Sequence, residues 1–430
     1  MAHTPALKIY SVAEHGIVYE HLSSAAREVL ETLHKHGFQA LVVGGGVRDF
    51  MLGQTPKDFD IATDATPEQT RELFRRCRIV GRRFKLAHVH VGREMIEVAT
   101  FRAQHQEQLG HLGSTNDSGM ITRDNIYGSL EEDAMRRDFT MNALYYNVSD
   151  RQVYDYTGGM QDIKSRVLRL IGEPELRYRE DPVRMLRAVR LSAKLGVSID
   201  AAAGQLIPRL AYLLEGVAAA RLFDELMKLL MAGFAESAWN SLQGTGILPV
   251  LFPVLSDEIR QAGWVDPMIA IAMANTDARI REAKPVTPAF LLAVLLWPAV
   301  KDRADHLQQQ MPIYPAMNEA ANQVLSEQTK AIAIPRRFTQ MMREIWLMQL
   351  RLPRRQGKRA EALLAERRFR ASYDFLLLRE QSEEIVTPAG ETSLGQWWTD
   401  YQQQDVDGRH QMVRRLGSHA GKKPRRRRRS

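Results

Sequence analysis

The sequence predicts an α+β protein: an N-terminal head with a mixed sheet and helices, followed by an all-helical neck and body. Two observations support this fold class. Up to residue 158, short apolar runs bounded by glycines alternate with amphipathic segments, which is typical of strands and helices that share one domain. From about Met160 onward the pattern is helical. With 430 residues, the chain is long enough for roughly two or three domains.

These patterns divide the chain into consecutive parts. They are an irregular lead-in (1–20), the head (21–158), a helical neck (159–215), a helical body (216–400) and a basic tail (401–430).

The central segment of the head begins with a strand, a glycine turn and a short helix. The apolar run Ala40–Val43 predicts a buried strand, and the glycines at 44–46 follow where the backbone must turn. Residues Val47–Leu52 can form a helix that Gly53 closes, and Pro56 prevents its continuation.

A pair of acids follows this turn. The stretch Lys57–Ile61 predicts a second strand, in which Asp58 and Asp60 share one face while Phe59 enters the core. Two adjacent like charges need a counter-charge, and a divalent cation with oxygen ligands supplies one. Beside a glycine turn and Arg48, such a site suits a nucleoside triphosphate. Taken alone, an Asp-x-Asp is also compatible with a solvated strand edge.

Further helices and strands flank this segment. Helical spacing predicts a helix over His21–His36, and the Thr-Pro-Glu start at 66–68 predicts another that runs to about Cys77. A strand carrying three cations is expected over 79–89, and a hairpin over 89–101. In this hairpin, Glu97 is either a third acidic group facing the aspartates or a residue of the solvated face.

The rest of the head combines a loop with a dense polar segment. Residues 105–125 are polar and rich in glycine and serine, so we expect a mobile loop. Ser129 begins a capping box that opens a helix. The stretch Arg136–Leu144 then combines two arginines, an aspartate, a hydroxyl and an amide with core residues, and Val153–Tyr156 forms a last strand.

The neck contains a helix with a stripe of arginines. Asp181 and the proline after it predict the start of a helix over Val183–Leu195. Arg184, Arg187 and Arg190 recur every three residues on one drifting face of that helix. Because no acid of the same helix balances them, contact with an anion or a base is favoured over a merely solvated face.

Charge and composition restrict the compartment and the partners. Residues 401–430 hold ten Lys and Arg against two Asp and Glu, which leaves 49 of each in the first 400 residues. The net charge of +8 thus belongs to the tail, either as a solubilising extension or as an arm for nucleic-acid phosphates. No apolar run approaches the roughly 20 residues of a membrane span, and we expect no secretion signal. The single cysteine, Cys77, excludes an internal disulfide, so a reducing cytoplasm is expected.

Four separated motifs now match one family in order. They read GGGVRD with DFD, IEVATFR, RRDFTMNAL and REDPVRMLRAVR, and together they span about residues 41–195. This arrangement resembles the class II nucleotidyltransferases of the DNA polymerase β superfamily, which comprise tRNA CCA-adding enzymes and bacterial poly(A) polymerases. The resemblance implies a polymerase β-like nucleotidyltransferase head, a neck that recognises the nucleotide base, and a body that binds RNA.

The resemblance also implies roles for residues around the glycine turn. Asp58 and Asp60 would be catalytic and would bind Mg²⁺ in a two-metal site. Gly45, Gly46 and Arg48 would bind the triphosphate of ATP.

A second set of implied roles concerns the polar segment and the neck. Arg137 and Asp138 would lie at the nucleotide, with Asp138 near the ribose 2′-OH and counted among the catalytic acids. Asp181 and Arg184 would hydrogen-bond the edge of the incoming base, in the place of a template. Arg187 would contribute to the nucleotide pocket.

The branch of the family is indicated by two further features. The segment IVGRRFKLAHV and the arginine-rich tail resemble the bacterial poly(A) polymerases, which implies addition of AMP from ATP to RNA 3′ ends. The main alternative is a tRNA CCA-adding enzyme with the same chemistry. Two others are an inactive RNA-binding protein on this scaffold and a DNA-binding regulator, although no recognition helix supports the latter. Protein partners and oligomeric state are not predicted.

Overall fold

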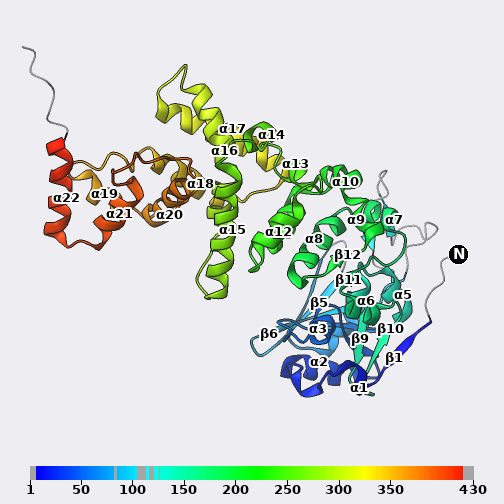
Figure 1. Cartoon of the computed structure of the whole chain (residues 1–430). Coiled ribbons are helices and arrows are strands. Elements are labelled where there is room, and N and C mark those ends of the chain that lie inside the picture. The colour runs from blue at the N-terminus through cyan, green and yellow to red at the C-terminus, as the bar shows by residue number, and fades with distance from the viewer. Residues whose placement is uncertain (1–5, 82–84, 104–112, 116–120, 125, 420–430) are drawn as a thin grey trace, which may run out of the picture. The chain divides into compact units, whose positions relative to one another are not determined.

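The chain folds into two compact units, Met1–Leu214 and Glu215–Ser430. The structure is a computed structural model (Figure 1), and it describes residues 6–81, 85–103, 113–115, 121–124 and 126–419. Within these ranges, no helix combines the length and the apolar character that a bilayer span requires.

An eight-stranded mixed sheet forms the centre of the first unit. Its strands in chain order are β1 (Lys8–Tyr10), β2 (Ala40–Val43), β3 (Asp60–Thr63), β4 (Cys77–Val80), β5 (Leu86–Val91), β6 (Glu94–Thr100), β9 (Leu144–Asn147) and β10 (Gln152–Asp155). In space they follow the order β1-β10-β9-β2-β3-β6-β5-β4. Of these pairings only β3 with β6 is parallel, and the others are antiparallel. The mixed sheet predicted for the head is therefore confirmed.

Helices and two small sheets complete this unit. The small sheets are β7 (Gly113–Thr115) with β8 (Ile121–Asp124), and β11 (Val167–Leu168) with β12 (Ser198–Ile199). The first helices are α1 (Val12–His15), η1 (Tyr19–His21), α2 (Ser24–Lys35), α3 (Gly45–Met51), α4 (Pro67–Leu73), α5 (Leu130–Arg136) and η3 (Thr140–Asn142). The later ones are α6 (Gly159–Ser165), α7 (Pro174–Glu180), α8 (Val183–Leu195), α9 (Ala201–Gly204), α10 (Ile207–Leu210) and η4 (Ala211–Gly216), which reaches the boundary of the second unit.

The core of the sheet explains why β2 is uniformly apolar. All four residues of β2 are buried, because both faces of this central strand are covered. On one face, Leu41 and Val43 pack with Leu130 and Ala134 of α5. The strand β3, which begins with Asp60, thus pairs with a strand whose four residues are all buried.

Several boundaries differ from the sequence prediction. The expected strand over Lys57–Ile61 begins only at Asp60, because Val43 pairs with Asp60 and β2 turns away at the next residue. Asp58 therefore lies in the segment that precedes the strand. The helix expected from Thr66 to about Cys77 ends at Leu73, since β4 begins at Cys77 and pairs with β5.

Two segments expected to be irregular contain strands. The lead-in before residue 21 supplies β1, which pairs with β10 at the edge of the sheet (Figure 1). The loop expected over 105–125 includes β7 and β8, which pair antiparallel. The remaining positions of that loop, the residues at 82–84 and the end of the basic tail lie outside the described ranges.

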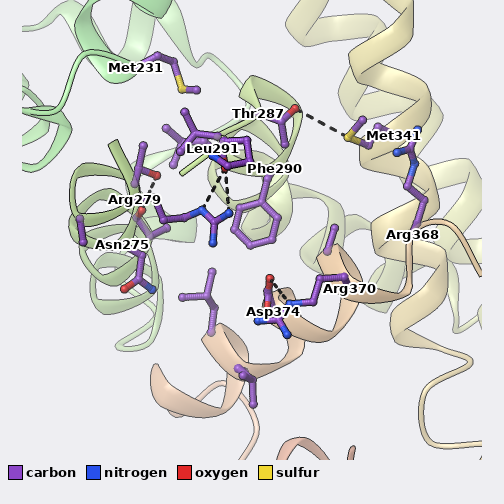
Figure 2. Close-up of a pocket in the computed structure, with 18 of the residues that line it drawn as sticks. Met231, Asn275, Arg279, Thr287, Phe290, Leu291, Met341, Arg368, Arg370 and Asp374 are labelled. Carbon is purple, nitrogen blue, oxygen red and sulfur yellow. Dashed lines mark hydrogen bonds and ion pairs between the residues drawn. The ribbon is translucent and has the colours of Figure 1, made fainter. Parts of the chain in front are cut away.

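The second unit is helical in the residues that the structure describes. Its helices are α11 (Ala219–Leu230), α12 (Ala235–Leu242), α13 (Ile247–Leu251), α14 (Asp257–Arg260), α15 (Val265–Arg281), α16 (Pro288–Leu307), α17 (Ile313–Ala331), α18 (Arg336–Gln349), α19 (Arg359–Leu364), α20 (Phe369–Gln381), α21 (Leu394–Gln403) and α22 (Val406–His419). The apolar helix α16 contacts α15, α17, α18 and α20, and its Trp297 is 1% exposed. A cavity opens among α15, α16, α18 and α20 (Figure 2).

Candidate active site

Two exposed acids mark one edge of the sheet in the first unit. Asp60 is the first residue of β3, and Asp58 precedes it by two positions. Both are exposed, whereas Phe59 between them and Ile61 after them are buried. The expected alternation of faces is therefore present, although Asp58 itself is outside the strand.

The electrostatics of this edge are unbalanced towards negative charge. The parallel pairing of β3 with β6 places Asp60 opposite Glu97. Partial burial, Glu97 and Asp58 together raise the pKa of Asp60 to about 6, and Arg137 opposes this increase. An additional positive charge at this position would therefore stabilise the ionised carboxylate.

Glu97 is a neighbour of the acidic pair, and its position answers the question that the sequence left open. Its Oε1 lies 3.6 Å from Nε2 of His88 on the adjacent strand. Across the described ranges, no three His, Cys, Asp or Glu side chains form a metal-binding group. Glu97 thus adds negative charge beside Asp60, but the side chains do not converge as three ligands.

The glycine turn between β2 and α3 brings the backbone close to this edge. Gly44 has φ 77° and ψ −131°, a conformation that residues with a Cβ rarely adopt. A Cβ on Gly46 would lie 3.4 Å from the carbonyl oxygen of Asp58 and from the Phe59 ring. Gly46 therefore lets α3 pack closely against the segment that carries Asp58.

Arg48, expected to bind a triphosphate, is directed into the protein. It is 4% exposed, and its Nε and Nη2 donate to Oδ1 of Asp49 at 2.9 and 2.6 Å. Its Nη1 donates to Oδ1 of Asn142 at 2.7 Å. The following residue in the chain thus neutralises Arg48, and a Cβ on Gly45 would be 3.4 Å from its Nη2.

Arg137 connects the acidic edge with the neck. Its Nε donates to the Tyr145 hydroxyl at 2.8 Å and to Asp133 at 3.1 Å. Burial alone would lower the pKa of Arg137. Tyr145 and Asp133 have the larger combined effect and raise this pKa above its usual range. A Cβ on Gly44 would lie 3.8 Å from Nη1 of Arg137 and 3.7 Å from Oδ2 of Asp60. This guanidinium therefore faces the same small space as the acid.

Asp138 is held by the arginine helix and by its own turn. Arg187 donates from Nε to Oδ2 at 2.8 Å, and the backbone N–H of Phe139 donates to Oδ1 at 2.8 Å. Asn142 adds a weaker bond at 3.3 Å. Burial alone would raise the pKa of Asp138, but Arg187 and Asn142 lower it to about 2. Asp138 is consequently ionised at neutral pH, and its two oxygens accept hydrogen bonds from Arg187, Phe139 and Asn142.

The corner between α7 and α8 orders Arg184 and Asp181. Nη1 of Arg184 donates to Glu180 at 2.8 Å and to the carbonyl oxygen of Arg177 at 2.7 Å. Asp181 accepts from the N–H of Val183 at 3.3 Å, but it is the C-terminal cap of α7, and the N-cap of α8 is Pro182, one residue later than predicted. Both Asp181 and Arg184 are less than 10% exposed. The arginine stripe is therefore balanced by acids from outside its own helix, which the sequence prediction did not anticipate.

Two functional candidates were missed from the sequence, Arg177 and Glu180. Arg177 donates from Nη2 to the carbonyl oxygens of both Arg136 and Arg137 at 2.6 Å, and from Nη1 to Glu180 at 2.6 Å. It thereby ties the neck to the polar segment of the head. Their spacing could have identified them. Arg177 and Glu180 lie three residues apart, as an ion pair on one helix face requires, and Glu180 directly precedes Asp181.

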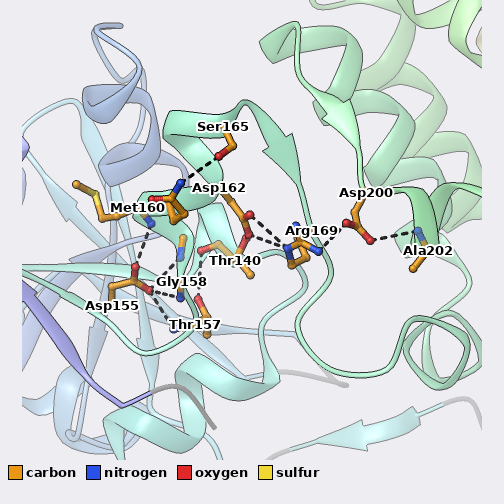
Figure 3. Close-up of polar contacts among 12 residues, drawn as sticks. Thr140, Asp155, Thr157, Gly158, Met160, Asp162, Ser165, Arg169, Asp200 and Ala202 are labelled. Atoms are coloured by element: carbon orange, nitrogen blue, oxygen red, sulfur yellow. Dashed lines mark hydrogen bonds and ion pairs between the residues drawn. The ribbon is translucent and has the colours of Figure 1, made fainter. Parts of the chain in front are cut away.

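A further polar network anchors the turn that carries Asp138 (Figure 3). Thr140 donates to Asp162 of α6 at 2.7 Å. Arg169 bridges Asp162 and Asp200, with distances of 3.2 and 2.6 Å. Asp155 accepts from the N–H groups at the start of α6, which satisfies donors that a helix leaves unpaired. The turn at Thr140 is thus held by its hydrogen bond to α6.

The structure thus brings the predicted residues together in two connected groups. The acidic edge contains Asp58 and Asp60 beside Gly44, with Arg137 next to it. The second group is the arginine corner, which we define as Asp138, Arg177, Glu180, Arg184 and Arg187. Arg48 is buried and bonded to Asp49 and Asn142, and the glycines at 45 and 46 allow close packing around the turn.

Family models match most of the chain in three segments. The poly(A) polymerase head domain matches residues 40–169. A probable RNA- and SrmB-binding site of polymerase A matches residues 196–259, and the arginine-rich C-terminus of polymerase A matches residues 309–430.

Relatives and solved structures agree with these matches. Poly(A) polymerase I of Salmonella typhimurium is 48% identical over 93% of this chain and 86% of its own length. The CCA-adding enzyme of Bacillus pumilus is 34% identical over 54% of this chain and 56% of its own length. A solved tRNA-processing enzyme shares the fold with a TM-score of 0.59 at 19% identity, over 90% of this chain and 99% of that chain. The chain therefore belongs to the bacterial poly(A) polymerase I family of polyadenylating nucleotidyltransferases.

Proposed function

We propose that the acidic edge transfers AMP from ATP to RNA 3′ ends by two-metal phosphoryl transfer, without a template. The observation that carries this proposal is the exposure of Asp58 and Asp60, two positions apart, where Glu97 adds further negative charge and, among the residues that the structure describes, Arg137 opposes it. The residues of this edge would act as the active site, with Asp138 contributing from the arginine corner.

The donor set at the edge fits magnesium. Mg²⁺ prefers carboxylate oxygens and is usually held by one or two of them together with substrate phosphates. Asp58 and Asp60 supply such oxygens. Burial and the charge of Glu97 raise the pKa of Asp60, and a bound cation would oppose that increase. When bound there, the metal would make the RNA 3′-OH a better nucleophile and would neutralise charge on the departing pyrophosphate.

The surrounding residues would position ATP. Arg137 faces the space between Gly44 and Asp60, so its guanidinium can donate to a phosphate or to the ribose. Asp181 and Arg184 would offer hydrogen bonds to the adenine edge, and Arg187 would complete the wall through Asp138. Because Glu180 and Arg177 hold Arg184, this wall is preorganised, which favours selection by hydrogen bonding. No covalent enzyme intermediate is required.

Binding of RNA would involve the second unit and the tail. The match at residues 196–259 is described as a probable RNA-binding site, and the tail carries most of the excess positive charge. Sequence-independent affinity for phosphates suits a polymerase that acts on many RNA ends. We place the enzyme in the cytoplasm, where polyadenylation would promote RNA turnover.

Addition of CCA to tRNA is the second candidate, because a CCA-adding relative is 34% identical over about half of this chain. The two functions separate in one assay. The purified protein is incubated with Mg²⁺, an unstructured RNA primer and each nucleoside triphosphate singly. Long ladders with ATP alone support the proposal, whereas limited C-then-A addition to tRNA lacking its end supports the second candidate.

The same assay tests the remaining alternatives. No incorporation with any nucleotide, together with intact RNA binding, would indicate an inactive RNA-binding protein on this scaffold. Preference for a DNA primer over an RNA primer would support the alternative of a DNA-binding regulator.

A further inference from the structure

The cavity in the second unit has the size of a ligand site (Figure 2). Its volume is about 520 Å³, and small-molecule sites typically measure about 300–1,000 Å³. It lies among α15, α16, α18 and α20, so all of its walls belong to one compact unit. No role follows for it from the proposed chemistry of the acidic edge.

One wall of the cavity is apolar and contains an aromatic ring. Met231, Leu291 and Met341 contribute to it, and the Phe290 ring projects towards the cavity (Figure 2). Phe290 packs edge-on against Phe375, with the ring centroids 6.2 Å apart. Because Phe290 is only half-buried, part of its surface is available for a flat group to pack against.

The polar lining of the cavity is rich in arginine. The charged residues are Arg279, Arg367, Arg368, Arg370, Glu282 and Asp374, a formal balance of +2. Arg279 donates from Nε and Nη2 to the carbonyl oxygen of Pro285 at 3.2 and 2.9 Å, which fixes its guanidinium at the wall. Asp374 is paired with Arg370 at 3.0 Å, so one acid of the lining is already neutralised. Glu282 pairs similarly with Lys284 at 2.6 Å. The pair with Asp374 also neutralises Arg370, and Arg368 is paired with Glu344 at 2.8 Å. Arg279 and Arg367 form no ion pair with the residues that the structure describes, so these two guanidinium groups give the cavity its preference for an anion.

Arg367 extends this preference beyond the cavity. It is exposed, and it makes no hydrogen bond or ion pair with any residue that the structure describes. It also lines a second cavity of about 530 Å³, in which Arg351 is paired with Glu366 and Arg368 with Glu344. Arg337 and Tyr314 contribute to the same lining. Arg367 thus lines both cavities with a guanidinium that has no ion pair among the described residues. A strand with repeated phosphates that passes from one cavity to the other could contact it.

We propose that the first cavity binds a nucleotide of single-stranded RNA, with the strand continuing past Arg367 into the second cavity. This inference rests on the proposed function, because the RNA would be the primer or its growing tail. The base would pack against Phe290 and the apolar wall, and phosphates would lie at Arg367 and Arg279. Aromatic platforms between basic residues are how proteins bind single strands without reading sequence. A repeating unit with one flat base and one phosphate matches this lining.

Binding is tested on the full-length protein without ATP and with a metal chelator, so that catalysis does not contribute. The probe is a fluorescent oligoadenylate of about 20 nucleotides, and its dissociation constant is measured by anisotropy at moderate salt. We expect Arg367→Glu to weaken binding roughly fivefold or more, because it removes a phosphate contact and adds repulsion. The matched control is Arg359→Glu, an equal charge change at an exposed position outside both cavities, for which the loss should stay within about twofold.

A second variant tests whether a base packs against the ring of Phe290. Phe290→Leu keeps an apolar side chain against Phe375 but removes the ring, and we expect binding roughly tenfold weaker with thermal unfolding close to wild type. Photo-cross-linking of an oligoadenylate that contains a reactive base should label α16 or α20.

Three results would overturn the inference. They are unchanged affinity in both variants, equal losses for Arg367→Glu and Arg359→Glu, and binding of an acidic peptide that depends on Arg367 while RNA binding does not. The last result would assign the cavity to a protein partner. Failure of the proposed function is distinct, because it appears as absent AMP incorporation whether or not the oligoadenylate binds.

Discussion

The acidic edge and the arginine corner are both clusters of like charge in the sequence, but the fold treats them differently. The arginines of the corner meet acids from other elements, since Arg184 contacts Glu180 and Arg187 contacts Asp138. At the edge, the negative charge of Glu97 raises the pKa of Asp60, and in the described part of the chain Arg137 opposes this increase. A cluster that the protein neutralises itself is part of its framework, whereas a cluster left unbalanced and exposed calls for a ligand. Mutations should therefore have opposite effects on stability in the two regions.

The largest effect is expected at the acidic edge. Asp58→Asn or Asp60→Asn should lower AMP incorporation by roughly a thousandfold or more, because each removes a charged oxygen ligand from the proposed metal site. The rate is measured with saturating ATP and a labelled RNA primer. Asp64→Asn is the control, since Asp64 follows the same strand but accepts from the N–H of Gln39 at 2.8 Å. Activity near wild type in either Asp58→Asn or Asp60→Asn would contradict the metal assignment.

Asp60→Asn should also make the metal-free protein more stable. The folded state holds Asp60 with a raised pKa of about 6, so its ionised form opposes folding at neutral pH. Two pKa units would correspond to nearly 3 kcal/mol, but solvent screening of this exposed residue reduces the expected gain to about 1 kcal/mol. Chemical denaturation with a chelator present measures it. A loss of stability would mean that the carboxylate already has its counter-charge within the chain.

The contrast between the two regions also explains what could be predicted from the sequence. The strand at 40–43, the glycine turn and the exposed acids follow from local rules of apolar patterning and backbone freedom. The charge of Glu97 beside Asp60 depends on the parallel pairing of β3 with β6, and no local pattern specifies that register. The acids that pair with Arg184 and Arg187 could not be predicted for the same reason, because they come from α7 and from the turn at Asp138.

The next effect is a loss of stability at the arginine corner. Arg187→Met should lower the free energy of unfolding by about 3 kcal/mol at neutral pH, because it leaves Asp138 as a buried carboxylate without its cation. The folded pKa of Asp138, about 2, lies below its unfolded value of 3.8, so the pair's contribution is complete above pH 3.8. It is lost as the pH falls through about 2, and the difference between the variant and wild type should shrink over that window.

Two further variants identify the origin of that loss. Adding Asp138→Asn to Arg187→Met should recover part of the stability, since the unpaired charge is then removed. Arg179→Met breaks an exposed pair with Glu175 on the neighbouring helix and should leave unfolding essentially unchanged. If Arg179→Met and Arg187→Met lowered the free energy of unfolding equally, the burial of the Arg187–Asp138 pair would not determine its contribution to stability.

A smaller effect is expected from Arg177, which we interpret as a positioning residue. Arg177→Met should raise the KM for ATP roughly tenfold and reduce discrimination between ATP and CTP, because the turn at Arg137 and the side chain of Arg184 lose a shared anchor. Arg177→Lys should restore only part of this, since one ammonium cannot reproduce the planar fork that contacts two carbonyls and Glu180. If stability falls but the ATP-to-CTP ratio of kcat/KM is unchanged, the residue is structural only.

The smallest effect concerns a buried polar group far from either cluster. His15 accepts from the N–H of Ile17 at 2.9 Å, and its Nε2 lies 3.0 Å from the carbonyl oxygen of Arg151. Burial lowers the pKa of His15 below 6.5, so the folded state binds fewer protons than the unfolded state. Its contribution to stability is complete above pH 6.5 and declines as the pH falls through the folded pKa, by at most about 1.4 kcal/mol for each unit of pKa difference.

His15→Gln should flatten this part of the stability curve, because glutamine keeps hydrogen-bonding capacity without titrating in this range. Denaturation of both proteins between pH 5 and 7 measures the difference. An identical slope would show that His15 gains no advantage from remaining neutral. The expected slope, in contrast, would show that His15, like the charged groups of the arginine corner, is stabilised by partners within the chain.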